Sequence, residues 1–281
     1  MVAQLLQFLN ILRFLPLPHL RALGVGLGLL LYALHRDRRH TVRVNLAFCF
    51  PAWTPEVREK KVREVFVYFV QSWLDRIWLW YAPKATLEKR LKVTYLPGSV
   101  PFDDQPTVIF APHFSGLDVG WTILNMLLEK RSTLIYAKQK NAALDNWVRV
   151  GRERSNTTQP ARVVEHLSSM RAAVQAMRRG EPLYLLPDMN YEPDDSFFLP
   201  FFRNTAATLP VLPRYAKLGR AKVVPMVTYM TKYGYETLIH PPWKNYPSGD
   251  TPAHLEADTF RMNIELEDWV RDMPTQYYWV H

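Results

Sequence analysis

The sequence predicts an α/β fold in which helices flank a central mixed sheet, with an apolar helical segment at the N-terminus. Two observations support this fold class. Short β-prone apolar runs alternate along the chain with longer stretches of helical periodicity. No linker, internal repeat or low-complexity segment divides the 281 residues, which are enough to bury a substantial core. The expected strands are residues 108–110, 133–137, 182–186, 222–229 and 236–240.

Helices are expected before and between these strands. Thr54 and Pro55 mark the start of one helix, which extends to about residue 81, because a capping Thr and a first-turn Pro favour initiation. Gly180 is expected to close another helix. Residues 83–106 and the aromatic segment 196–202 read as irregular. The remaining expected helices are residues 117–129, 141–150, 162–179, the end of 205–219, and 254–272.

The N-terminal segment predicts a membrane anchor. Its longest uninterrupted apolar stretch is residues 22–34, shorter than the roughly 20 residues that a spanning helix needs. A basic cluster follows, which suits the cytoplasmic face of an anionic membrane: Arg36, Arg38, Arg39 and Arg43. We therefore expect residues 1–40 to form a tilted or monotopic anchor and residues 41–281 the catalytic domain. A hairpin buried in a soluble core is the alternative.

His113 follows the first expected strand, just after Pro112, at the kind of position where open α/β sheets carry their chemistry. Four residues separate it from Asp118, so a turn could bring the carboxylate to the imidazole. A carboxylate on one ring nitrogen fixes the tautomer and leaves the other nitrogen free to accept a proton. Such a pair can activate a substrate hydroxyl. In the simpler interpretation His113 is packed and hydrogen-bonded, and Asp118 only complements a helix dipole.

Further polar residues follow other elements. Asp188 and Asn190 come directly after the strand at 182–186, so they are expected to meet His113 in one cleft. Three arginines surround Gly151, and clustered guanidiniums suit a phosphate or a developing oxyanion, although a solvated basic surface is equally compatible: Arg149, Arg152 and Arg154.

The formal net charge of +9 predicts an anionic partner. Nucleic acid is disfavoured, because the aromatic residues cluster with apolar residues and are not interleaved with Lys and Arg. The many aromatic side chains favour a lipid interface or an acyl-binding cavity. The single cysteine, Cys49, excludes an internal disulfide, and no Cys/His cluster has the spacing of metal ligands. We therefore expect neither a bound metal nor a bound cofactor.

Five motifs in order along nearly the whole chain resemble a known family. They are Asn45 and Leu46 with Phe50 and Pro51; His113 with Asp118; the run Gly151, Arg152, Glu153, Arg154, Ser155, Asn156; Pro187, Asp188, Met189 and Asn190 with Phe201 and Phe202; and Pro274, Thr275, Gln276, Tyr277, Tyr278 and Trp279. Together they resemble the late acyltransferases of lipid A biosynthesis, the lauroyl/myristoyl transferases of the glycerolipid acyltransferase superfamily. Many members carry Glu where this chain has Asp118.

The resemblance implies an enzyme of the inner membrane, active on its cytoplasmic side. It would transfer a fatty acyl chain from acyl-carrier protein, or from acyl-CoA, to a hydroxyl of a lipid A precursor. His113 would act as general base and Asp118 would orient it. Arg152, with Arg154 or Arg149 as substitutes, would hold an oxyanion or phosphate. Residues of the substrate cleft would be Asp188, Asn190, Ser115 and Gly116.

Alternatives stay open at this point. A relative that acylates a lysophospholipid, an ornithine lipid or a glycolipid would use the same catalytic pair. A catalytically silent membrane scaffold predicts instead that His113 and Asp118 lie apart. Acyl-chain length depends on a cavity floor, for which the candidate lining residues are Trp73, Trp121 and Phe201.

Overall fold

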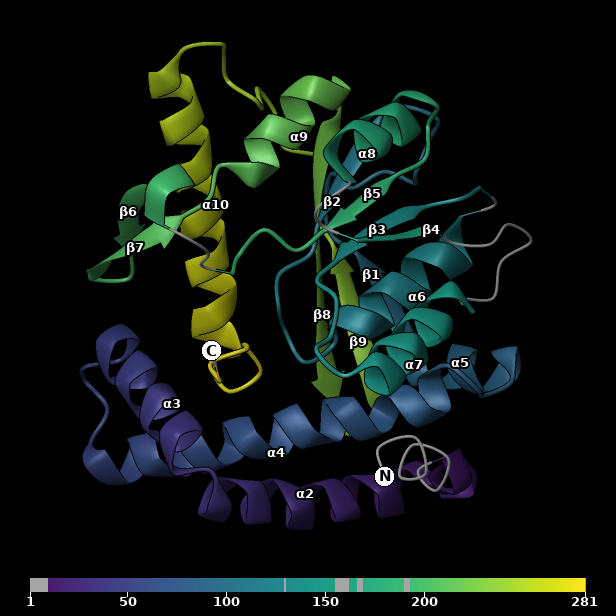
Figure 1. Ribbon diagram of the computed structural model, residues 1–281, viewed down its shortest axis with the longest axis vertical. Coiled ribbons are helices and arrows are strands. Elements are labelled where there is room, and N and C mark those ends of the chain that lie inside the picture. Colours follow the sequence, from purple (N-terminus) through teal and green to yellow (C-terminus); the bar gives the residue numbers. More distant parts are fainter. Residues whose placement is uncertain (1–9, 129, 155–161, 166–168, 190–192, 281) are drawn as a thin grey trace.

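The computed structural model describes residues 10–128, 130–154, 162–165, 169–189 and 193–280 (Figure 1). Its helical elements are η1 (Asn10–Phe14), α2 (Leu17–Leu34), α3 (Arg36–Cys49), α4 (Pro55–Leu79), α5 (Lys84–Arg90), α6 (Leu117–Leu127), α7 (Ala142–Glu153), α8 (Ser169–Arg178), η3 (Pro193–Asp195), α9 (Val211–Gly219) and α10 (Pro252–Asp272). Its strands are β1 (Leu91–Tyr95), β2 (Thr107–Phe110), β3 (Thr133–Tyr136), β4 (Arg162–Glu165), β5 (Leu183–Leu185), β6 (Phe197–Phe201), β7 (Asn204–Thr208), β8 (Lys222–Thr231) and β9 (Gly234–Ile239).

Seven strands form the central sheet in the order β1-β9-β8-β2-β5-β3-β4. The strands from β8 to β4 run parallel to one another, β9 is antiparallel to β8, and β1 is parallel to β9. The sheet is therefore mixed, and helices lie on both of its sides (Figure 1). This confirms the predicted mixed α/β architecture.

The core divides into two layers because alternate residues of a strand face opposite sides of the sheet. Val108 and Phe110 of β2 belong to a cluster with α8, α9 and α10. Ile109, between them, belongs to the cluster on the other side, with α6, α7 and the second half of α4. Both faces of β2 are thus buried, as its uninterrupted apolar sequence predicts.

Within the predicted anchor, whose residues 1–9 lie outside the described residues, the main element is α2, which lies along α4 on the side of α4 away from the sheet (Figure 1). Glycines allow the close approach. A Cβ built on Gly24 would lie 2.5 Å from Cγ of Gln71, and one on Gly28 would lie 2.7 Å from Cα of Val67. Within the described residues, α2 is the one helix long and apolar enough to cross a membrane, and only 22% of that stretch is buried in the protein. Its exposed apolar residues are Leu23, Val25, Leu27, Leu29, Leu30 and Leu34.

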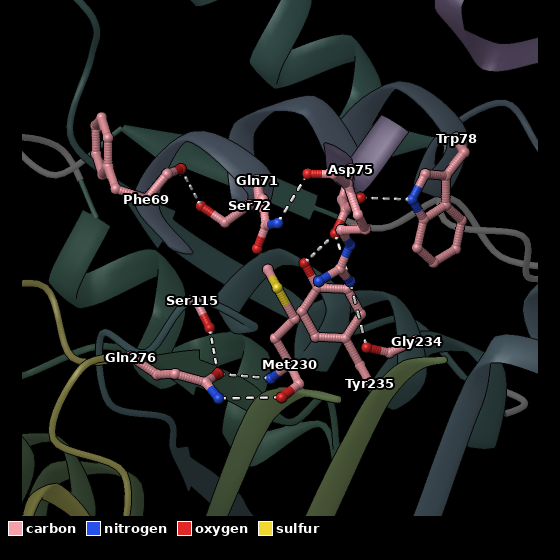
Figure 2. Close-up of polar contacts among 11 residues, drawn as sticks. Phe69, Gln71, Ser72, Asp75, Trp78, Ser115, Met230, Gly234, Tyr235 and Gln276 are labelled. Atoms are coloured by element: carbon pink, nitrogen blue, oxygen red, sulfur yellow. Dashed lines mark hydrogen bonds and ion pairs between the residues drawn. The ribbon is translucent and has the colours of Figure 1, made fainter. Parts of the chain in front are cut away.

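A buried polar network also joins α2 to α4 and β9. Arg21 of α2 forms an ion pair with Asp75 of α4 at 2.8 Å. The same carboxylate accepts hydrogen bonds from the Tyr235 hydroxyl (2.7 Å) and from Nε1 of Trp78 (3.0 Å), as Figure 2 shows. Gln71 donates to the carbonyl of Arg21. A buried carboxylate needs such partners, because an unpaired buried charge is strongly destabilising.

The structure differs from the sequence-based prediction in three segments. Residues 162–179 do not form one helix: the start is strand β4, whose Val163 and Val164 pair with β3, and the helix α8 begins at Ser169. β-branched valines favour the strand. The aromatic segment 196–202 is not a loop but strand β6, which pairs with β7 in a hairpin whose turn holds Phe202 at a φ of 55°. Residues 83–106 also contain α5 and β1.

Candidate active site

The site lies where β2 and β5 end. These strands are parallel neighbours, and Phe110 pairs in register with Leu185. His113 leaves β2 and Asp188 leaves β5, so the two side chains emerge at the same edge of the sheet. The carboxyl ends of parallel strands are where α/β folds place ligand sites.

His113 and Asp188 form a direct pair. Nδ1 of His113 lies 2.7 Å from Oδ1 of Asp188, and the backbone N–H of His113 donates to Oδ2 at 2.8 Å. The Asp188 side chain is fully buried, whereas the imidazole is 20% exposed. A carboxylate at Nδ1 stabilises the tautomer that carries its proton there. Nε2 is then the basic nitrogen, and no described residue hydrogen-bonds to it.

The expected contact between His113 and Asp118 was wrong. The carboxylate of Asp118 instead accepts from Nε of Arg76 at 2.5 Å and from Nε of Arg152 at 2.6 Å. Helix geometry explains the difference, because Asp118 is in the first turn of α6 and is buried against α4 and α7. That His113 and Asp118 are not paired is what the silent-scaffold alternative predicts. The imidazole nevertheless has another carboxylate partner, Asp188, which that alternative does not require.

Asp118 is a buried anion between two cations. Burial by itself would raise the pKa of Asp118, but the guanidiniums of Arg152 and Arg76 outweigh it and hold that pKa at about 2. Helix α7 packs closely against Trp80, and this places Arg152 beside Asp118. A Cβ on Gly151 would lie only 2.2 Å from the ring of Trp80. The glycine of the Gly-Arg-Glu-Arg-Ser-Asn motif therefore permits the approach that positions the following arginine.

The C-terminal segment after α10 fixes the loop that carries His113. Ser115 donates its hydroxyl proton to Oε1 of Gln276 at 2.6 Å, and its backbone N–H donates to the carbonyl of Gln276. The Gln276 amide also pairs with both backbone groups of Met230 in β8, as Figure 2 shows. The hydroxyl of Tyr277 donates to the carbonyl of Asp188 at 3.2 Å. The loops that carry His113 and Asp188 are thus both held by one motif of the sequence.

A cavity of about 370 Å³ opens beside His113, and we call it the His113 cavity. Its polar lining residues include His113, Ser115, Arg76, Arg152, Gln139 and Gln276. Its apolar lining includes Ile135, Val148, Leu186, Leu209, Val211 and Tyr215. A cavity with one apolar wall and a cluster of convergent polar groups is typical of a site that binds a lipid-like substrate next to a reacting centre.

A second cavity, of about 400 Å³, is lined in part by the loop that carries Asp188, and we call it the Phe201 cavity. Asp188, Phe201, Cys49 and Met262 are among its lining residues. Both cavities share Pro187, Met189, Tyr277, Tyr278 and Trp279. The loop that carries Asp188 and the C-terminal motif therefore border both cavities.

The structure brings only some of the predicted polar residues together. Arg152 and Ser115 line the His113 cavity, whereas Gly116 caps α6 next to it. Arg149 forms an ion pair with Glu153 at 2.9 Å, and the Arg154 guanidinium lies over the ring of Tyr81 at 4.8 Å. Neither of these two arginines lines either cavity, so the predicted substitutes for Arg152 lie outside the site. Asn190 lies outside the described residues.

The three aromatic candidates have different surroundings. Trp73 lines the His113 cavity and Phe201 lines the second cavity. Trp121 lines neither, because it is fully buried against Tyr184 and donates to the backbone carbonyl of Arg152. Trp121 therefore supports the site from behind and is not a wall of either cavity.

The sequence argument missed Arg76. It lies near the end of α4, one residue from Asp75, within a stripe that looks like ordinary helix core. An arginine amid aromatic residues at helical spacing was the available signal, since a buried cation needs a charge partner. Among the described residues there is no group of three or more His, Cys, Asp or Glu that could hold a metal ion.

Comparison with known proteins shows the family of the chain. The model of the family described as bacterial lipid A biosynthesis acyltransferase matches residues 4–281. The lipid A biosynthesis palmitoleoyltransferase of Escherichia coli is 28% identical over 273 residues, which are 95% of this chain and 85% of that protein. A lipid A biosynthesis acyltransferase of Haemophilus influenzae is 29% identical, covering 97% of this chain and 84% of its own length. The E. coli lipid A biosynthesis lauroyltransferase is 27% identical, with 95% and 85% covered.

Proposed function

The chain belongs to the bacterial lipid A biosynthesis acyltransferase family and is an acyltransferase, and from this premise we propose that it transfers a fatty acyl chain from acyl-carrier protein to a hydroxyl of a lipid A precursor. The observation that carries the proposal is the His113–Asp188 pair at the mouth of an apolar-walled cavity. The pair supplies a general base, and the wall offers a place for an acyl chain.

In the proposed reaction Nε2 of His113 removes the proton of the acceptor hydroxyl. The resulting alkoxide oxygen attacks the thioester carbonyl carbon and gives a tetrahedral oxyanion. When the oxyanion collapses, the new ester C–O bond remains, the C–S bond breaks, and the thiolate takes the proton from the imidazolium. No acyl-enzyme forms. General-base catalysis of this kind contributes typically about 10²–10⁴-fold.

Asp188, and not Asp118, is the carboxylate that assists His113 in this proposal. Its 2.7 Å contact with Nδ1 supports a role in holding the tautomer and in stabilising the imidazolium that forms during proton transfer. Arg152, beside the cavity, is suited to stabilise the oxyanion, because a guanidinium forms strong hydrogen bonds to anionic oxygen.

We assign the enzyme to the cytoplasmic face of the inner membrane. The exposed leucines of α2 offer a face to the acyl layer, and the basic residues at the start of α3 suit an anionic lipid surface. Docking of α2 on α4 through Gly24, Gly28 and the Arg21–Asp75 ion pair favours an interfacial anchor over a detached spanning helix. Withdrawal of α2 would leave the buried Asp75 without its cation.

The test is transfer by the purified full chain in detergent. Wild-type protein with lauroyl, myristoyl or palmitoleoyl acyl-carrier protein and a lipid A precursor should give a product heavier by one acyl group, detected by mass spectrometry. His113→Ala should lose at least 10²-fold in kcat and keep its melting temperature. Retention of more than a tenth of wild-type turnover would remove His113 from the mechanism.

The same assay separates the alternatives. Acyl-CoA replaces the carrier-protein donor in one arm, and a lysophospholipid, an ornithine lipid or another glycolipid replaces the acceptor in the others. Preference for one of those acceptors over the lipid A precursor would overturn the proposed acceptor but keep acyl transfer. The basic surface of the chain favours the acidic carrier protein and a phosphorylated glycolipid.

A further inference from the structure

Arg76 is a cation in the wall of the His113 cavity that the proposed reaction has not used. It lies in the last turn of α4, and its side chain is 9% exposed. Its Nε donates to Asp118, and its guanidinium lies 3.8 Å from the centre of the Trp73 ring. Both contacts restrain the plane of the guanidinium, because an ion pair fixes one edge and cation–π stacking fixes one face.

Neither Nη group of this guanidinium has an acceptor among the described residues, because its hydrogen bond to Asp118 comes from Nε. Nη1 of Arg76 is buried and makes no hydrogen bond to any described residue. A buried polar group without a partner costs about 1–3 kcal/mol, more when it is charged. Retaining such a donor beside a cavity is understandable if a ligand supplies the acceptor.

The nearby carboxylates are already engaged. The two oxygens of Asp118 serve the Nε atoms of Arg76 and Arg152, and Asp188 serves His113. Asp75, the neighbour of Arg76 on α4, faces the other way and pairs with Arg21. Because Asp118 has a pKa of about 2, it stays ionised at neutral pH and keeps holding the arginine.

We propose that Arg76 is a catalytic residue whose Nη groups donate to an anionic oxygen of the substrates in the His113 cavity. The oxygen belongs either to the tetrahedral oxyanion or to a substrate phosphate, since both present the same acceptor to a guanidinium. This inference rests on the proposed acyl transfer. It gives Asp118 a positioning role: the aspartate holds the arginine and not the imidazole.

The test compares Arg76→Met and Arg76→Lys with wild-type protein in the acyl-transfer assay, with donor and acceptor varied separately. Arg63→Met is the matched control, because Arg63 is exposed on the same helix and lines neither cavity. If the oxyanion is the ligand, Arg76→Met lowers kcat by about 10²–10³-fold with little change in KM. If a phosphate is the ligand, the KM of one substrate rises at least tenfold while kcat changes little.

Folding is separated from chemistry by two further measurements. All variants are compared by melting temperature, and Arg76→Ala is assayed with added guanidinium ion, which should restore part of the activity only where a missing guanidinium was the cause. An Arg76→Met protein that keeps more than a third of wild-type kcat and KM for both substrates overturns the inference while leaving acyl transfer intact.

A wild-type protein without acyl transfer would refute the proposed function instead. Whether Arg76 binds an anion would then be tested by calorimetric titration of the wild-type and Arg76→Met proteins with inorganic pyrophosphate. Weaker binding to Arg76→Met supports the anion site. Equal heats, including no heat from either protein, overturn it.

Discussion

Replacement of Asp188 by Asn tests the central pair of the site. Asp188 uses one oxygen to accept from the backbone N–H of His113 and the other to accept from Nδ1. An Asn side chain has only one oxygen. If that oxygen keeps the backbone bond, the NH₂ group faces Nδ1 and the imidazole must carry its proton on Nε2. In that tautomer the nitrogen that faces the cavity can no longer accept a proton from the hydroxyl.

The expected loss follows from this tautomer. The wrong tautomer costs about 10³–10⁴-fold in kcat, equivalent to about 4–5 kcal/mol of transition-state stabilisation. The assay is acyl transfer from acyl-carrier protein, with product measured by mass spectrometry and folding checked by melting temperature. Retention of more than a tenth of wild-type kcat by a folded Asp188→Asn protein would refute the assignment of Asp188 as the partner of His113.

Three further predictions concern stability and anchoring. In the folded protein Asp118 has a pKa of about 2, against an ordinary value of 3.8. Its ion pairs therefore stabilise the fold by about 2 kcal/mol above pH 4, and this stabilisation is lost as the pH falls toward 2. In urea unfolding, the free energy of unfolding of Asp118→Asn should depend less on acid pH than that of the wild-type protein. Gly28→Ala should destabilise the folded protein by about 1–3 kcal/mol, because the added Cβ meets the α4 backbone. Gly26→Ala should stabilise the folded protein slightly, because its Cβ would have nothing within 4 Å. A lower melting temperature for Gly26→Ala than for Gly28→Ala would contradict this packing of α2 on α4. Leu30→Glu should weaken sedimentation with anionic vesicles at least tenfold without changing transfer in detergent, and unchanged sedimentation would exclude the α2 face as the lipid contact.

Much of the sheet was predictable because its strands are buried on both faces. Val108, Ile109 and Phe110 form an apolar run, which is typical of a strand buried on both faces inside a sheet. Because His113 and Asp188 each follow such a run, the sequence indicated that both lie at one edge of the sheet. The pairing of the two was not predictable. It depends on β2 and β5 being neighbours, although 75 residues separate His113 from Asp188 along the chain.

The four-residue spacing favoured Asp118 as the partner of His113. Closeness in the sequence does not determine, however, in which direction the first turn of a helix points its side chains. The first turn of α6 directs this carboxylate toward α4 and α7, where it accepts hydrogen bonds from Arg76 and Arg152. Arg76 itself is hidden in the aromatic stripe of α4. The boundary of α8 was missed for a related reason, because the amphipathic pattern continues backward through β4 without a break.

Helix α4 contacts both the proposed anchor helix α2 and the His113 cavity. Gln71 and Asp75 hold α2 from one side of α4, whereas Ser72, Trp73 and Arg76 form part of the His113 cavity on its other side. Deleting the first 34 residues to obtain a soluble enzyme would therefore remove α2 from the outer side of α4, whose inner side lines the His113 cavity. It would also leave the buried carboxylate of Asp75 without its counter-ion, Arg21. Detergent or nanodisc preparation of the intact chain is the route to crystals and kinetics that this architecture recommends.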